Sequence, residues 1–192
     1  LQLGWEWRAP FRFGRIAEVL EESSALSIAD SVRLQTDYLS LPARRLVRVV
    51  ADLEIGDGEA AAAQRLLKGW DAELDVDSAP AALFEVWFRC CLRTAVVEEI
   101  AVQWDALTAE AAKELGGLHT HHLLTLMEAP DSRLGAQPVA TRDRLLRETL
   151  SAAFAETRTL LGSDPQAWRW GDLHGIELRH PLSEHMPDDL RE

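Results

Sequence analysis

The densest group of potential metal ligands in this sequence is the histidine cluster at residues 119–122, which reads HTHH. His119 and His122 are three residues apart, a spacing that places two side chains on one face of a helix. A metal site needs three or four ligands, and no Cys, Asp or Glu lies within one turn of the cluster. We therefore interpret the cluster as the solvated start of a helix, with a metal site as the alternative.

A second candidate for chemistry is the set Ser163, Asp172 and His174, which has the residue types of a hydrolase triad. The three residues are too close in sequence to be diagnostic, and no nucleophile elbow accompanies Ser163. We do not favour a triad here. The sequence also contains no Walker A, GxGxxG or HExxH motif.

Arg12 is the most informative single cation, because it falls in the first turn of a helix expected over residues 11–22, directly after Pro10. A positive charge there opposes the helix dipole, at a cost of roughly 0.3–1 kcal/mol. Its position therefore indicates a partner, either a carboxylate or a functional site. An ordinary surface or salt-bridged arginine is the alternative.

The composition is that of a globular protein: 192 residues, 47% hydrophobic and 27% charged, with a net charge of −12. The negative charge argues against binding to nucleic acid or to an anionic membrane. No apolar run approaches the ~20 residues that span a bilayer. Glu98, Glu99 and Asp105 are interpreted as solvated helix faces, and the adjacent Cys90 and Cys91 as reduced thiols rather than a redox pair.

The hydrophobic spacing predicts helices and gives no alternating run that demands a strand. Ser27 and Asp30 form a capping-box variant at the start of a helix. Pro42 is expected to break or bend this helix, which begins at Ser27. The longest helix is expected over 81–103, with a packed face spaced by three and four residues: Leu83, Val86, Trp87, Cys90, Thr94 and Val97. The predicted helices are 11–22, 27–41, 43–53, 59–68, 81–103, 108–117, 118–127 and 141–161.

Four blocks of sequence carry a resemblance to a known family. They are WEWRAPFRFGRI at residues 5–16, QTDYLS at 35–40, LLKGWD at 66–71, and WRWGDLH at 168–174 followed by HPL at 180–182. In this order they resemble the middle of the β-chain of penicillin amidase-type acylases, which are self-processing N-terminal nucleophile hydrolases. The resemblance implies that residues 1–192 are one helical segment of an α+β (αββα) enzyme, with ends that dock on sheets outside it.

Enzymes of this family hydrolyse linear amides such as penicillins, cephalosporins and acyl-homoserine lactones. The resemblance implies a nucleophilic N-terminal Ser with its own α-amine as base, and an oxyanion held by a backbone amide and an Asn side chain. Residue 1 is Leu, and the chain contains no Asn. We therefore expect the nucleophile and the Asn to precede Leu1, the sheets to follow Glu192, and this segment alone to be inactive.

The resemblance also assigns a role to Arg12, because an arginine four residues before the Ile of this helix lies beside the active site in the family. There it helps to position the Asn and the free amine of the nucleophile. Arg15 is the weaker candidate for this role.

For the remaining blocks the resemblance implies structural roles. Trp170 is expected to anchor its segment, Gly171 to permit a tight turn, and His174 to make a buried hydrogen bond rather than to act in catalysis. Asp37 and Ser40 are expected to be local packing and capping groups, and Trp70-Asp71 to end a helix against the core.

The expected partners are the α-chain and the rest of the β-chain of the acylase, together with a small-molecule amide substrate. No cofactor or metal is expected in this segment, since any calcium would lie elsewhere in the enzyme. A periplasmic or secreted location follows from the resemblance alone. The alternative is a free-standing helical binding or scaffold module without chemistry, which predicts a well-packed body with no exposed apolar seam.

Overall fold

The computed structural model describes residues 9–23, 25–103 and 118–175, and within these ranges it contains helices and turns but no strand. The one β-type contact there is an isolated antiparallel bridge between Leu39 and Glu73. The predicted mainly α class is therefore confirmed. The helical elements are α1 (Phe11–Glu22), α2 (Ile28–Gln35), α3 (Leu41–Ala51), α4 (Glu59–Leu67), α5 (Ala79–Val86), the π-helical turn η1 (Trp87–Leu92), α6 (Arg93–Gln103), α8 (Thr120–Glu128), η2 (Ser132–Leu134), α9 (Pro138–Leu161), η3 (Pro165–Ala167) and η4 (Trp170–Asp172).

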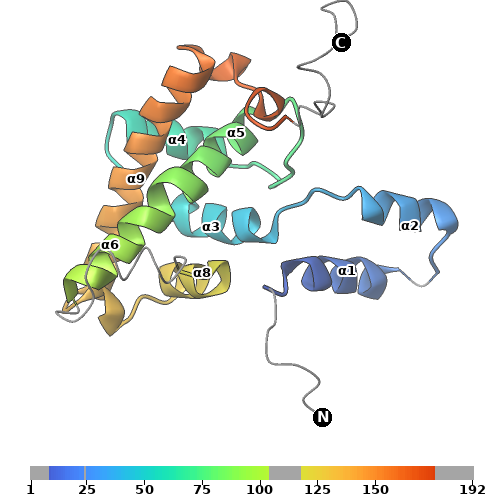
Figure 1. Ribbon diagram of the computed structural model, residues 1–192, viewed down its shortest axis with the longest axis horizontal. Coiled ribbons are helices and arrows are strands. Elements are labelled where there is room, and N and C mark those ends of the chain that lie inside the picture. Colours follow the sequence, from blue (N-terminus) through green and yellow to red (C-terminus); the bar gives the residue numbers. More distant parts are fainter. Residues whose placement is uncertain (1–8, 24, 104–117, 176–192) are drawn as a thin grey trace, which may run out of the picture.

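Helix α9 packs against α4, α5 and η1, and Figure 1 shows it running along one side of the body next to α4, α5 and α6. Its buried face carries Leu145, Leu146, Leu150 and Phe154, which are spaced as on one side of a helix. The helix begins at Pro138 and not at the expected Thr141, because a proline in the first turn removes no intrahelical hydrogen bond.

The predicted long helix over 81–103 is confirmed as a continuous run of α5, η1 and α6. The buried face that the sequence predicts for it is wrong just after Trp87, at Cys90 and Thr94. Residues 81–88 are all buried, and after them the buried positions of the described run are Leu92 and Val96, so that Leu83, Trp87, Leu92 and Val96 follow one another at four, five and four residues. A π-helical turn contains one residue more than an α-helical turn, so η1 brings Leu92 rather than Cys90 onto the buried face.

The thiols of Cys90 and Cys91 are both free, the first exposed and the second half-buried, in agreement with the prediction of reduced cysteines.

The predicted helix from Ser27 to residue 41 is too long, although its start is confirmed by the capping box of Ser27 and Asp30. Helix α2 ends at Gln35. A new helix, α3, then begins after Ser40, whose side chain accepts a hydrogen bond from the Ala43 amide. Pro42 therefore starts a helix instead of breaking one, because its missing N–H would have no partner in a first turn anyway.

Helices α1 and α2 form a hairpin that differs from the rest of the described chain, since neither helix contains a buried residue. We call residues 11–37 the α1–α2 hairpin. Figure 1 shows it extending to one side of the body, next to the start of α3. The apolar side chains of α1 are only partly covered: Phe11 packs against the core, while Phe13 is 75% exposed.

The segment after α9 is anchored by Trp168, which is buried against Phe154 and donates its indole N–H to the Gly162 carbonyl at 2.8 Å. Gly171 lies in the tight 3-10 turn η4, as predicted, and it also allows a close approach to another segment. Its N–H donates to the Val76 carbonyl at 2.8 Å, and a Cβ at this position would lie 3.2 Å from the same oxygen. The predicted buried hydrogen bond of His174 is wrong, because His174 is exposed and its ring stacks on Trp170.

Several predictions lie outside the described residues. These are the helix over 108–117, the solvated Asp105, the aromatic block before Ala9 and the HPL block at 180–182. Among the helices that the structure describes, none is both long and apolar enough to cross a membrane.

Candidate functional site

The histidine cluster is exposed at the beginning of α8, with His119 at the N-cap position. The rings of His119 and His122 meet edge to face with centroids 6.1 Å apart. Within the described ranges no group of three or more His, Cys, Asp or Glu side chains could hold a metal ion. The exposure of the three histidines at the beginning of α8 agrees with the interpretation as a solvated helix start.

The candidate triad residues belong to the segment that follows α9. Ser163 is exposed just after the end of the helix, and His174 faces the Trp170 ring at a centroid distance of 4.8 Å with the two planes 7° apart. Parallel stacking engages the face of the imidazole and gives this residue a packing contact with the indole.

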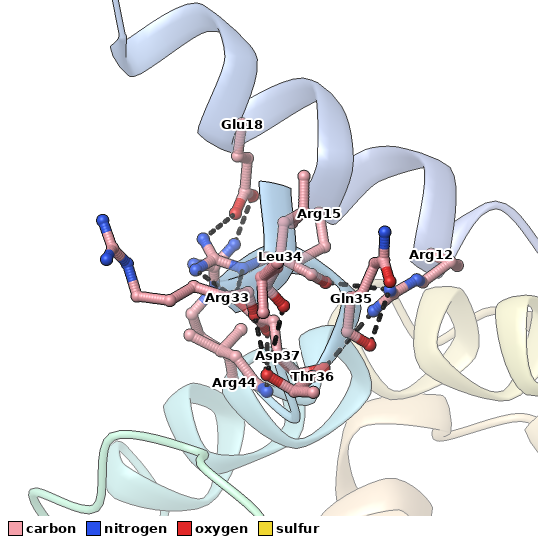
Figure 2. Close-up of polar contacts among 11 residues, drawn as sticks. Arg12, Arg15, Glu18, Arg33, Leu34, Gln35, Thr36, Asp37 and Arg44 are labelled. Atoms are coloured by element: carbon pink, nitrogen blue, oxygen red, sulfur yellow. Dashed lines mark hydrogen bonds and ion pairs between the residues drawn. The ribbon is translucent and has the colours of Figure 1, made fainter. Parts of the chain in front are cut away.

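The guanidinium of Arg12 is bound by the C-terminal end of α2 (Figure 2). One terminal nitrogen donates to the carbonyl oxygens of Leu34 at 2.9 Å and Gln35 at 3.4 Å, and the other donates to the Asp37 carbonyl at 3.3 Å. The last carbonyls of a helix lack intrahelical partners and carry the negative end of the helix dipole. The partner that the sequence predicts for Arg12 is thus a helix terminus, not a side-chain carboxylate.

Arg15, one turn further along α1, binds the side chain of Asp37 (Figure 2). Its Nε and one terminal nitrogen both donate to Oδ2, at 3.0 and 2.7 Å, while Oδ1 accepts the Leu39 amide at 3.0 Å. Both side chains are largely covered, with 20% and 15% of their surfaces exposed. The hydrogen bonds from Arg15 hold the pKa of Asp37 below its ordinary value of 3.8.

The charge network continues from α1 to α3. Arg15 also contacts Glu18 at 3.5 Å, and Glu18 forms an ion pair with Arg44 of α3. The hydrogen bond from Arg44 lowers the pKa of Glu18 below its ordinary value of 4.5. We call Arg15, Glu18, Asp37 and Arg44 the latch network, since it joins α1, the α2–α3 connection and α3.

A shallow groove of about 230 Å³ runs between α1 and α2, with Arg12 on its wall. Most of its lining is aliphatic, including Ile16, Leu20 and Leu34. The site therefore presents a cation, bound to a helix terminus, beside a partly open apolar surface.

The sequence singled out Arg12 and did not predict its carbonyl partners or the latch network. Asp37 and Ser40 were expected to be local packing and capping groups: Ser40 is the N-cap of α3 and accepts the Ala43 amide, whereas Asp37 accepts the Leu39 amide within the α2–α3 connection and caps no helix. The pairing of Asp37 with Arg15 was missed. A signal was present in the spacing of Arg12, Arg15 and Glu18, which places the three on one side of a helix.

The comparisons with known proteins agree with this arrangement of sequence blocks. The profile of the penicillin amidase family matches residues 1–191, so the chain belongs to the penicillin amidase family.

Within that family the chain is similar to proteins named acyl-homoserine lactone acylase QuiP. The protein of Pseudomonas syringae pv. tomato is 26% identical over 195 residues, which cover 91% of this chain and 23% of the relative. The protein of Pseudomonas fluorescens is 26% identical over 213 residues, which cover 95% of this chain and 26% of the relative. The protein of Pseudomonas aeruginosa is 25% identical over 209 residues, which cover 97% of this chain and 24% of the relative. The chain spans about a quarter of the length of these relatives.

Proposed function

We propose that this chain is a helical part of an acylase that hydrolyses a linear amide bond, with an acyl-homoserine lactone or a penicillin-type amide as substrate. One observation carries the proposal: the family match extends over residues 1–191, and the relatives that share almost all of the chain are named acyl-homoserine lactone acylases. The chain's contribution is support of the active site and not the nucleophile.

The proposed reaction needs groups that this chain does not contain. An N-terminal nucleophile hydrolase uses a Ser, Thr or Cys with a free α-amine, and its oxyanion is stabilised by a backbone N–H and an Asn side chain. No Asn is present among the 192 residues. In this proposal the rest of the acylase supplies the nucleophile, the base and the Asn.

The exposed apolar side chains of the α1–α2 hairpin support docking onto the rest of the acylase. Large apolar side chains with substantial exposure gather there: Phe13, Leu20, Leu26, Ile28 and Val32. Phe13 and Ile28 are 75% and 85% exposed. Concentrated apolar exposure of this kind marks an interaction surface. It counts against the alternative of a free-standing scaffold module, which predicts no apolar seam.

Arg12 is the residue of this chain that we propose to lie beside the active site, with Arg15 as the second candidate. Its contacts support a fixed location, because three carbonyl oxygens orient the guanidinium. A guanidinium held in this way can in turn orient a neighbouring amide or carboxylate.

Assay of the full-length protein tests both parts of the proposal, using a chromatographic measurement of homoserine lactone released from an N-acyl-homoserine lactone, and penicillin G as a second substrate. Arg12→Lys keeps the charge but removes the planar fork, and we expect it to lower kcat/KM by about tenfold or more. Arg33→Gln is the control, because Arg33 forms an exposed ion pair within α2.

Absence of amide hydrolysis by a folded, processed protein would contradict the acylase and favour the scaffold module. An active Arg12→Lys enzyme together with an inactive Arg15→Lys enzyme would transfer the proposed role to Arg15.

The remaining expectations apply to the whole enzyme. We propose a periplasmic or secreted location, which cell fractionation tests directly. The described part of the chain contains no group of three or more His, Cys, Asp or Glu side chains that could hold a metal ion. We therefore propose that any calcium of the enzyme binds elsewhere.

A further inference from the structure

The α1–α2 hairpin has no hydrophobic core of its own to fix its position. Neither of its helices contains a buried residue, whereas α3 buries Ala43, Leu46, Val47 and Val50. Direct packing between α1 and α3 is narrow and includes Gly14, where an added Cβ would lie 3.2 Å from Leu41. Phe11 packs against the core of the body, and beyond this contact and the one at Gly14 the position of Arg12 relative to the body depends on polar contacts.

Those polar contacts form a connected path from Arg12 to the body. Arg12 is bound to the carbonyls at the end of α2 and to that of Asp37. The Asp37 side chain is bound to Arg15, Arg15 contacts Glu18, and Glu18 pairs with Arg44 on α3 (Figure 2). Asp37 therefore contributes its carbonyl to Arg12 and its carboxylate to Arg15, and it couples the two arginines.

We infer that Asp37 is a positioning residue of the acylase, which acts through the latch network to hold Arg12 in place against the body. This inference deepens the proposed function and rests on it. Asp37 does not touch the reacting atoms in this scheme. It fixes the end of α2, and the end of α2 orients the guanidinium.

The charge arrangement supports this role over that of ordinary surface ion pairs. An isolated exposed ion pair stabilises a fixed side-chain position only weakly. In a network, one side chain takes part in two ion pairs, so less side-chain entropy is lost for each ion pair formed. The Arg15–Asp37 pair is mostly covered and uses two donors on one carboxylate oxygen. By contrast, Arg33 pairs with Asp30 on the same hairpin with 73% of its side chain exposed, outside the latch network.

The variant that isolates the role of Asp37 is Asp37→Asn in the full-length enzyme. The Asn oxygen can still accept the Leu39 amide, so the turn is kept, but an NH2 group then replaces Oδ2, the acceptor of both hydrogen bonds from Arg15, and both bonds are lost together with the negative charge. We expect kcat for N-acyl-homoserine lactone hydrolysis to fall by about 10- to 100-fold with KM unchanged, since small misplacements of a positioned group act on the chemical step. Arg33→Gln is the matched control and should retain the wild-type kcat.

Hydrogen exchange read by mass spectrometry supplies a measurement that does not depend on activity. Amides of residues 11–22 should exchange faster in Asp37→Asn than in the wild type, and at the wild-type rate in Arg33→Gln. The charge reversals Glu18→Arg and Arg44→Glu should each reproduce the faster exchange and the lower kcat. Their combination restores an ion pair of opposite polarity between α1 and α3, but it still lacks the Arg15–Glu18 contact, and it should recover part of both.

The inference is overturned if Asp37→Asn retains its kcat, if it changes KM alone, or if residues 11–22 exchange at the wild-type rate. It is also overturned if the double charge reversal recovers neither measurement. A processed wild-type protein without amide hydrolysis would refute the proposed function and the catalytic part of this inference together. In that case, faster exchange in Asp37→Asn would still identify the latch as a structural element.

Discussion

The α1–α2 hairpin and the helical body are held in place by different forces. In the body, α9 packs against α4, α5 and η1 around fully buried side chains such as Trp87 and Leu150. In the hairpin no helical residue is buried, and it meets the body through the Glu18–Arg44 ion pair, a narrow contact at Gly14 and the partly buried Phe11. The same chain therefore contains a region fixed by burial of apolar surface and a region fixed by charge.

The difference in force implies a difference in stability. Full burial of a leucine-sized side chain contributes about 1.5–3 kcal/mol, whereas an exposed ion pair contributes about 0–1 kcal/mol. Regions with few buried contacts open locally at lower free energy than the core. The hairpin should therefore respond to pH and salt under conditions in which the body does not change.

The largest expected effect is on the core of the body. Leu46→Ala removes a side chain of α3 that has no exposed surface, and we expect a loss of about 2–5 kcal/mol in the free energy of unfolding. Leu20→Ala on α1 is the matched change at a position that is 49% exposed, with an expected loss below about 1 kcal/mol. Urea unfolding measures both, and equal losses would contradict the division into two regions.

The next effect comes from a buried polar pair in the body. The indole N–H of Trp87 donates to Thr149 Oγ1 at 2.9 Å, and both side chains are buried. Thr149→Val leaves the N–H without this acceptor, so we expect a loss of about 1–3 kcal/mol in unfolding free energy. Thr159→Val, at an exposed position of the same helix, is the control and should change stability little. A Thr149→Val protein as stable as the wild type would show that this bond contributes nothing.

A smaller loss is expected where the final segment meets the body. In Gly171→Ala the new methyl group lies 3.2 Å from the Val76 carbonyl oxygen and 3.3 Å from its Cβ, so one backbone segment must shift. We expect a loss of about 1 kcal/mol, at the low end for overpacking. Gly175→Ala has no atom within 4 Å of the new methyl group and should be neutral. The shift in the thermal midpoint of unfolding compares the two variants.

The smallest expected effect is on the pH dependence of stability, which should have opposite signs in the hairpin and in the body. Asp37 and Glu18 have folded-state pKa values below 3.8 and 4.5, so the stability that they contribute is present above those values and is lost as the pH falls through the lowered ones. Burial raises the pKa of Glu85 in the body above 4.5, so its protonation stabilises the body as the pH falls toward 4.5.

Hydrogen exchange between pH 7 and pH 3 tests this separation, after correction for the intrinsic exchange rate. Protection of residues 11–22 should decrease only below about pH 4.5, and added salt should enhance the loss because it screens the latch network. Protection of residues 79–92 should not decrease over the range from pH 7 to pH 4.5. If the amides of the hairpin stay protected from exchange at pH 3 in high salt, ion pairs do not hold the hairpin against the body.

The helices themselves were predictable because the information for them is local. The capping box of Ser27 and Asp30 and the apolar spacing of α9 specify helices through contacts three or four residues apart. The predicted helix boundaries are wrong where one residue type is compatible with both the end and the start of a helix. Pro42 ends one helix as well as it begins another, and only the extended connection at Ser40, whose amide binds the Ala72 carbonyl, decides between them.

The candidate site was predictable only in part, for a similar reason. Arg12 was found because a cation in a first turn conflicts with the helix dipole. Its acceptors are backbone carbonyls more than twenty residues away, which have no sequence signal of their own. His174 shows the reverse error, since a histidine among tryptophans suggested burial and the ring instead lies exposed on Trp170.

The sequence by itself determined the helical class, most helix starts and the membership in an acylase family, because these depend on neighbouring residues and on short blocks in a fixed order. The tertiary structure alone decided that η1 turns Leu92 inward, that Gly171 meets Val76, and that Asp37 joins Arg15. The last two are contacts between segments far apart in the chain, and the first is a change of helical register that the packing of the body selects. Their partners are selected by packing and charge in three dimensions and not by spacing along the sequence.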